Sequence, residues 1–334
     1  MENKICNENL QQKLALFASN TQDIKSSFRW HDEMSKRLAA LLYALNGRII
    51  DCGAIEEAHK LIKNNTGAFS VFRGNMALCV AALMSMNDNP ENVFSNTLAV
   101  YEMLKKTKLY ASDFLAVAAY QIAAHGNPEQ YGLIVERTRA FYDGMKSKHW
   151  FLTGQDDYIF AAMLGLSDIE VSDGTEHMEQ IFSRLKPEFW GSNSLQTLTQ
   201  VLILGGNTAE APDRVLVLRD ALKNHNIKLD KTYTLPVLGT LALIPIDAET
   251  IVNDIDHAQL FLRSQKGFGS FSVDKQQLLI FSASIVASVY AENLKDNVLT
   301  AALATSITNI IIAQEAAMIA AICASSAAAA AASN

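Results

Sequence analysis

The sequence predicts an all-α fold built from repeated antiparallel helical hairpins of about forty residues. The first observation is a regular spacing, because apolar runs stop at turn signals that are 41, 39, 41, 38 and 41 residues apart. The second is a change within each unit, from an element that is apolar on all sides to one that is apolar on a single face. The third is that strand signals are weak, since alternating β-branched runs are short. The turn signals are Asn46, Asn87, Gly126, Ser167, Gly205 and Ile246.

The first element of each unit is expected to be an apolar helix. A helix that is apolar on all sides has to be covered on several sides, so we expect these helices to be buried. The runs are MALCVAALMSM from Met76, FLAVAAYQIAA from Phe114, YIFAAMLGL from Tyr158 and LTQVLIL from Leu198.

The second element of each unit is expected to be an amphipathic helix. Its apolar residues follow one another at steps of three and four, which places them on one face. We expect each face to pack against the apolar helices. The faces are Phe94, Leu98, Tyr101 and Leu104; Tyr131, Ile134, Val135, Thr138, Phe141, Tyr142 and Met145; Met178, Ile181, Phe182, Leu185 and Phe189; and Ile251, Ile255, Ala258 and Leu262.

Residues typical of helix starts stand where these elements are expected to begin. Asn89-Pro90-Glu91 and Asn127-Pro128-Glu129 each place a capping amide before a proline and an acid, which predicts the start of an amphipathic helix. The apolar helices are expected to begin at residues whose side-chain oxygen can accept a backbone N–H. These are Asp113, Asp156 or Asp157, Asn193, and Thr232 or Thr234.

Stacked hairpins of this kind bury one another's apolar faces, which predicts an open α/α superhelix. A closed α/α toroid with the apolar helices as its inner ring is the alternative, because those helices are apolar on more than one side. We assign residues 1–295 to the hairpin domain. Residues 296–334 are rich in alanine and are expected to form a terminal helix that packs on or caps this domain, with a frayed tail.

Composition and charge exclude several classes of partner. The net charge of −7 is spread over 334 residues without a basic stripe, so nucleic acid is not an expected partner. The start of the chain lacks a signal-peptide pattern, and its four cysteines lie far apart with no C-x-x-C pair, so we expect a reduced, cytoplasmic protein. The uncharged segment 298–314 is interrupted by threonine, serine and asparagine, so we do not expect membrane association through it.

Three stretches of the chain resemble a known family. They are FRGNMALCVAALMSMNDNPENVF, KHWFLTGQDDYIFAAMLGLSD and LKPEFWGSNSLQTLTQVLILGG. They are similar to an uncharacterised bacterial family, the domain of unknown function numbered four thousand and three, and the similarity runs from about Leu14 to Ala332. The resemblance implies a helical bacterial protein, and it assigns no activity and no site residue.

The segment from His149 to Tyr158 is the most suggestive candidate site. Trp150, Gln155, Asp156 and Asp157 crowd a turn between helices, and paired acids beside a histidine can bind a divalent cation or transfer a proton. A structural interpretation is favoured, because every hairpin needs caps. In it Gly154 permits the turn, Asp156 or Asp157 caps the next helix and Trp150 packs over the end of the hairpin.

A second group of polar residues falls at corresponding positions of successive hairpins. Arg73 and Asn75 stand before an apolar helix and could face an anionic ligand, although a capping and salt-bridging role is the favoured interpretation. If the array is concave on that side, these residues would line one groove. The candidate groove residues are Arg73, Asn75, Asp113, Gln121, Trp150, Gln155, Asp156, Asp157, Asn193, Gln196 and Gln200.

The signatures of metal and cofactor sites are absent from the sequence. The seven histidines form no H-E-x-x-H or H-x-H motif, and no glycine-rich phosphate loop or G-x-S-x-G motif is present. We therefore expect no metal ion and no cofactor. The leading hypothesis is a non-enzymatic binding or scaffold protein that holds a protein segment, a peptide or a small ligand on a concave face. The alternative is an enzyme with an α/α toroid, whose central pocket is lined by the N-termini of the apolar helices.

Overall fold

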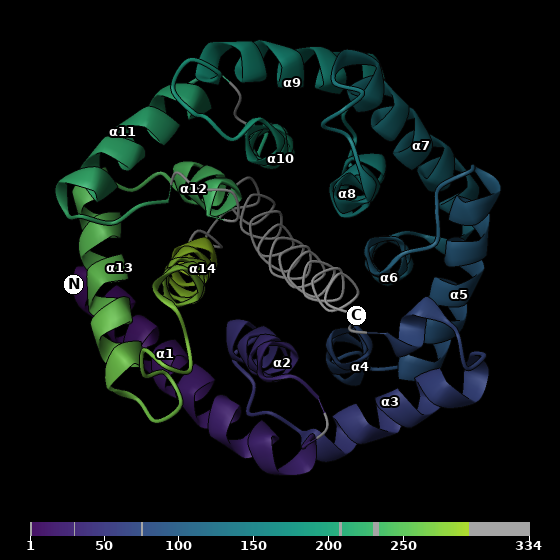
Figure 1. Ribbon diagram of the computed structural model, residues 1–334, viewed down its shortest axis with the longest axis horizontal. Helices are drawn as coiled ribbons and strands as arrows, with labels where there is room; N and C mark the ends of the chain where they lie inside the picture. Colours follow the sequence, from purple (N-terminus) through teal and green to yellow (C-terminus); the bar gives the residue numbers. More distant parts are fainter. Residues whose placement is uncertain (1, 30, 75, 207–208, 230–233, 294–334) are drawn as a thin grey trace, which may run out of the picture. The chain divides into compact units, whose positions relative to one another are not determined.

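The chain folds into α-helices, as the sequence predicts. The computed structural model describes residues 2–29, 31–74, 76–206, 209–229 and 234–293, and of residues 2–7 it describes the backbone alone. Over these residues it contains fourteen α-helices, three short 3-10 helices and no β-strand (Figure 1). The predicted helix within 296–334 and the candidate residue Asn75 lie outside the described part.

The chain forms two compact units, each taken over its described residues. Unit 1 comprises Met1–Ser26, Tyr43–Ile50 and Glu176–Gln314, and unit 2 comprises Ser27–Leu42, Asp51–Thr175 and Glu315–Asn334. In unit 2 the helices are α3 (Cys52–Asn65), η1 (Val71–Arg73), α4 (Ala77–Ser85), α5 (Pro90–Lys106), α6 (Asp113–His125), η2 (Pro128–Gln130), α7 (Tyr131–Lys148), η3 (Gln155–Asp157) and α8 (Tyr158–Leu166). In unit 1 they are α1 (Glu2–Ser27), α10 (Ser192–Leu204), α11 (Ala211–Asn224), α12 (Leu235–Ala242), α13 (Ala248–Ser264) and α14 (Lys275–Asn293). Three of the segment boundaries fall within α1, α2 (Glu33–Leu45) and α9 (Val171–Leu185), and one falls between Ile50 and Asp51, before α3.

Unit 2 consists of two layers of helices. The apolar helices α4, α6 and α8 form one layer, and the amphipathic helices α3, α5 and α7 form the other (Figure 1). Every residue of α4 from Ala77 to Met84 is buried, as is every residue of α8 from Tyr158 to Gly165. On α7 the buried residues are the seven that the sequence predicts, from Tyr131 to Met145. The hydrophobic core of this unit is therefore formed by the apolar helices and the buried faces of the amphipathic helices that pack on them.

Unit 1 repeats the same pairing of helix types. The apolar helix α12 packs against α10, α11 and α14, and α13 packs against α14. All residues of α12 are buried, and so are all residues of α14 from Leu278 to Ala291. On α13 the predicted face of Ile251, Ile255, Ala258 and Leu262 is buried.

The predicted helix ends agree with the observed ones to within a few residues. Helices α6, α8 and α10 end one residue before Gly126, Ser167 and Gly205, whereas α12 stops earlier, at Ala242. The two predicted asparagine caps act as caps, because Asn89 Oδ1 accepts from the N–H of Asn92 at the start of α5, and Asn127 Oδ1 accepts from the N–H of Glu129 at the start of η2. The open or closed form of the array stays a prediction.

Two predicted starts differ from the structure. The cap of α6 is Ser112 and not Asp113, because Ser112 Oγ accepts from the N–H of Leu115. Helix α10 begins at Ser192 after Gly191, one residue before Asn193. In both cases a small residue next to the expected cap adopts the extended or turn conformation that precedes a helix.

Two arginines bind the carbonyl oxygens that follow an apolar helix. Arg137 on α7 donates to the carbonyl oxygens of Gly165, Ser167 and Ile169 at 3.1, 2.8 and 2.6 Å. Arg214 on α11 donates in the same way to the carbonyl oxygens that follow α12, at Ala242, Ile244 and Ile246. Each guanidinium group satisfies carbonyls that have no partner within the helix.

In the described part of the chain, no helix combines the length and the apolar character that are needed to cross a membrane. The segment after Val298, for which the sequence raises this question, lies outside the described residues.

Candidate functional site

Three loops of unit 2 meet at one edge, where α4, α6 and α8 begin. Gly74, after η1, lies against Asp113 at the start of α6, because a Cβ atom on Gly74 would be 3.0 Å from Asp113 Oδ1. The N–H of Tyr110, before α6, donates to the hydroxyl of Tyr158 at the start of α8, at 3.2 Å. We call this surface the aromatic edge, and it comprises residues 63–74, 104–112 and 146–157.

The charged candidates at the aromatic edge take part in local structure. Arg73 donates from Nε to Thr66 Oγ1 at 3.1 Å and from its terminal nitrogen to the carbonyl oxygens of Lys63 and Thr66, so it closes the end of α3. Asp157 is buried, and its Oδ2 accepts from the N–H of Gly154 at 2.9 Å. Arg73 thus has the capping role that the sequence interpretation favours, whereas the Asp157 side chain closes the turn at Gly154 and makes no cap hydrogen bond to α8.

Asp113 is the candidate acid with an altered acidity. Its side chain is largely buried at the start of α6, and this burial raises the pKa of the Asp113 carboxyl above its usual value. The neighbouring Tyr101 also has a raised pKa, first because of burial and then because of the charges of Glu102 and Asp113. A carboxyl of this kind takes up a proton more readily than an exposed one.

The remaining polar candidates divide between solvent and core. Gln155 is exposed and Asp156 is partly exposed in η3, next to Gly154. Gln121 is buried within α6, and Gln196 and Gln200 are buried within α10 of unit 1, where Asn193 is exposed. The structure thus brings Arg73, Trp150, Gln155, Asp156 and Asp157 to the aromatic edge, with Asp113 directly after it at the start of α6, and it places Gln121, Gln196 and Gln200 inside the protein.

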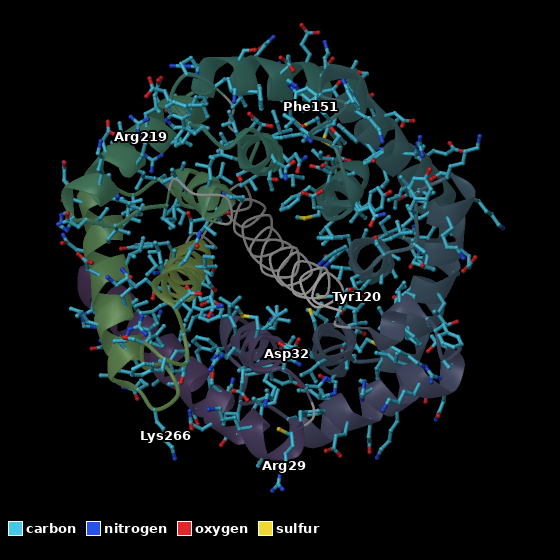
Figure 2. The ribbon with its side chains drawn as sticks, viewed as in Figure 1. Arg29, Asp32, Tyr120, Phe151, Arg219 and Lys266 are labelled. Carbon is cyan, nitrogen blue, oxygen red and sulfur yellow. The ribbon has the colours of Figure 1, made fainter. Side chains whose placement is uncertain are left out.

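Four large aromatic side chains project from the aromatic edge. Phe69 is fully exposed, and Tyr110, Trp150 and Phe151 are 71%, 74% and 69% exposed. The ring of Trp150 meets the ring of Phe151 edge to face, with centroids 5.9 Å apart; Phe151 is labelled in Figure 2. Trp150 therefore does not pack over the end of the hairpin, contrary to the structural interpretation of the sequence.

The equivalent loops of unit 1 also expose aromatic side chains. Trp190 precedes α10 and Phe271 precedes α14, and both are fully exposed. Arg219 on α11 (labelled in Figure 2) holds the first of these loops, since it donates to Glu188 at 2.8 Å and stacks on the ring of Phe189. Across the described residues, every exposed aromatic side chain lies in a loop that leads into an apolar helix.

A pair of buried tyrosines lies under the loop of the aromatic edge that carries Tyr110. Tyr142 on α7 and Tyr158 on α8 are buried, with ring centroids 5.1 Å apart. Arg139, on the same face of α7, donates to the carbonyl oxygen of Thr107 at 2.6 Å. Burial raises the pKa of both tyrosines, so they remain neutral at pH 7. Their role is to position the loop that carries Tyr110.

Sequence analysis did not identify Phe69, Tyr110, Trp190 and Phe271 as site residues. The available signal was positional, because an aromatic residue recurs in the loop between an amphipathic helix and the next apolar helix. An aromatic residue in a turn is usually taken to pack against its own hairpin. Only the structure shows that these rings face solvent.

Unit 1 contains a groove of about 550 Å³ between the end of α11, α13 and the start of α14. Some of its polar side chains, among them His225 and Arg263, have partners within the unit. His225 lies 3.2 Å from both Asp256 and Glu249, and these contacts raise the pKa of its imidazole, Asp256 first. Arg263 donates to the carbonyl oxygens of Phe268 and Val273. The groove is therefore held by internal ion pairs and hydrogen bonds.

The described part of the chain holds no group of three or more histidine, cysteine, aspartate or glutamate side chains that is arranged to bind a metal ion.

The chain belongs to the family described as protein of unknown function (DUF4003), whose model matches residues 20–316. It is also similar to the uncharacterized protein YeaA of Bacillus subtilis (strain 168), with 25% identity over 322 residues, which cover 92% of this chain and 93% of YeaA. No solved structure matches the chain. The family membership agrees with the resemblance found in the sequence.

Proposed function

We propose that the protein is a non-catalytic binding module whose binding face is the aromatic edge of unit 2. The observation that carries the proposal is the placement of exposed aromatic rings, which in the described part occur solely in loops before apolar helices. Burial of one such side chain against a partner contributes about 1.5–3 kcal/mol, and clustered exposed apolar groups mark interaction sites. Aromatic anchors are also the residues that dominate binding surfaces.

The proposed face and the groove predicted from the sequence use different residues to contact a partner. Gln121, Gln196 and Gln200 are buried, and Arg73 and Asp157 already bind backbone groups. The aromatic rings have no such role in the fold. Binding through them is therefore a better account of the surface than binding through the polar groups.

The enzymatic alternative would depend on Asp113. Its raised pKa suits a general acid, but of the other two acids at these helix starts, Asp156 and Asp157, Asp157 already accepts from the N–H of Gly154. We place the binding function in the bacterial cytoplasm. This localisation is supported by Cys52 and Cys79, neither of which is in a disulfide, and by the bacterial relative.

Hydroxyl-radical footprinting tests the proposed face without assuming a partner. Labelling of the full chain inside the cells that produce it is compared with labelling of the purified protein. We expect Phe69, Tyr110 and Trp150 to be protected in cells, because a partner covers them. Leu133 on α7 is 57% exposed, lies outside the edge and should be labelled equally in both samples. Equal labelling of the aromatic residues would contradict the proposal.

A further inference from the structure

The two edges of unit 2 carry opposite charge. The aromatic edge contains seven basic side chains and two aspartates, of which Asp157 is buried. The opposite edge, residues 86–91, 126–130 and 167–173, contains six acidic residues and no lysine or arginine. The basic residues are Lys63, Arg73, Lys105, Lys106, Lys108, Lys146 and Lys148, and the acidic ones are Asp88, Glu91, Glu129, Asp168, Glu170 and Asp173.

Part of this asymmetry follows from helix dipoles, which favour acids at the start of a helix and lysines at its end. The dipoles do not explain Lys108. This residue follows the last turn of α5 with φ of 67°, in the left-handed region that glycine adopts at lowest cost. A lysine here is unfavourable for the fold, and it places an exposed cation two residues from Tyr110.

The exposed cations of the edge are lysines. Lys106, Lys108 and Lys148 are exposed, whereas the single guanidinium group of the edge, that of Arg73, binds the carbonyl oxygens of Lys63 and Thr66. Lysine is depleted at protein–protein interfaces, and arginine is the residue that nucleic acids and bidentate phosphate contacts favour. Exposed lysines beside aromatic rings match a surface of lipid headgroups better.

We propose that the aromatic edge docks on the surface of a lipid bilayer that carries anionic headgroups, a step that rests on the proposed binding face and names its occupant. Phe69, Tyr110, Trp150 and Phe151 enter the interfacial region, and the lysines between them remain beside the phosphates. The acidic edge faces away from the anionic surface, so the charge asymmetry orients the unit. No spanning helix is required.

This mode of membrane contact differs from a terminal membrane helix, which the sequence does not favour. Such a helix would lie in the segment after Val298. Here the lipid-facing groups come from three loops far apart in the chain, and each loop alone carries too few cations to form a basic stripe.

Flotation of the full chain with vesicles tests the proposal. We expect binding to vesicles of phosphatidylcholine mixed with phosphatidylglycerol, and little binding to phosphatidylcholine alone. High salt should weaken the binding because it screens the lysines. The paired change Trp150→Ser with Phe151→Ser should lower the partition coefficient about tenfold or more, since two rings no longer enter the bilayer. The matched control Leu133→Ser removes an exposed apolar side chain outside the edge and should bind like the parent.

Charge variants separate binding from folding. Lys108→Gly should weaken vesicle binding about fivefold, as expected for one cation near an anionic surface, while thermal stability rises or stays the same. Lys148→Gln should give a similar loss. Lys60→Gln removes an exposed lysine from the middle of α3, outside the edge, and should not change binding.

Three results would overturn the lipid assignment: equal binding to neutral and anionic vesicles, normal binding by the Trp150→Ser, Phe151→Ser variant, or no vesicle binding by the parent. If footprinting in cells still shows protected aromatic residues, the binding face stands and its occupant is not an anionic bilayer. If that protection is also absent, the proposed function fails together with the lipid assignment.

Discussion

At the residue scale, the pair of histidines beside α3 makes stability depend on pH. His31 and His59 stack with ring centroids 5.2 Å apart. Burial, the charge of Lys63 and the charge of His31 lower the pKa of His59 to about 4, and burial also lowers the pKa of His31. In the unfolded chain the pKa of each histidine is about 6.5, so between about pH 6.5 and pH 4 the unfolded state binds more protons. Stability contributed by the neutral rings is therefore complete above this window and is lost as the pH falls through it.

We predict that His59→Gln reduces the loss of stability on acidification from about pH 7 to about pH 5. Because the ring is partly exposed, solvent screening limits the difference to about 1 kcal/mol. Urea unfolding at several pH values measures it. His177→Gln, at an exposed position on α9, should retain the dependence of the parent. An identical pH dependence for His59→Gln and the parent would show that the histidine pair contributes nothing.

At the element scale, α7 and α8 approach most closely at a glycine. A Cβ atom on Gly165 would lie 2.4 Å from Thr138 Oγ1 and 2.9 Å from the backbone of Ile134 and Thr138. Gly165→Ala should destabilise unit 2 by about 2–3 kcal/mol, because the two helices must move apart. Gly132→Ala, at an exposed position of α7 with nothing near its Cβ, should be neutral or stabilise by about 0.5 kcal/mol. Denaturant unfolding followed by circular dichroism compares them, and equal stability of the two variants would contradict the close packing.

The arginine contacts after α8 and α12 are a second feature at this scale. Arg137 uses two separate nitrogens of its guanidinium group, whereas lysine has one, so Arg137→Lys should lose part of these contacts and cost about 2–3 kcal/mol. Arg214→Lys should cost a similar amount because its contacts are the same. The control is Arg29→Lys, since Arg29 is exposed and projects away from the chain (Figure 2). Thermal unfolding provides the measurement. An unchanged melting temperature of both Arg137→Lys and Arg214→Lys would argue against a stabilising role for these arginines.

At the scale of the whole chain, periodicity predicts helices well and surfaces poorly. The buried face of α7 and the ends of α6, α8 and α10 follow directly from apolar spacing and turn residues. The aromatic edge could not be predicted in the same way. Whether Tyr110 packs or projects depends on the path of its loop, which is held by the distant residues Tyr158 and Arg139. The basic character of the edge was hidden for a similar reason, because its lysines belong to three separate stretches of a chain whose net charge is −7.

Cys79 reports whether unit 2 opens as a whole. It is fully buried in α4, and burial raises the pKa of its thiol, so it reacts with thiol reagents only when the surrounding structure opens. The test uses a chain in which the other three cysteines are replaced by serine. If the α7–α8 contact and the surroundings of α4 are lost in one step, Gly165→Ala should speed labelling of Cys79 about thirtyfold or more. We expect this coupling because α6 packs against α8 and α5, and α5 in turn packs against α4. Gly132→Ala should leave the labelling rate unchanged or lower it. Faster unfolding without faster labelling would mean that α4 retains its protection while α7 and α8 separate, and the unit would then consist of hairpins that open independently.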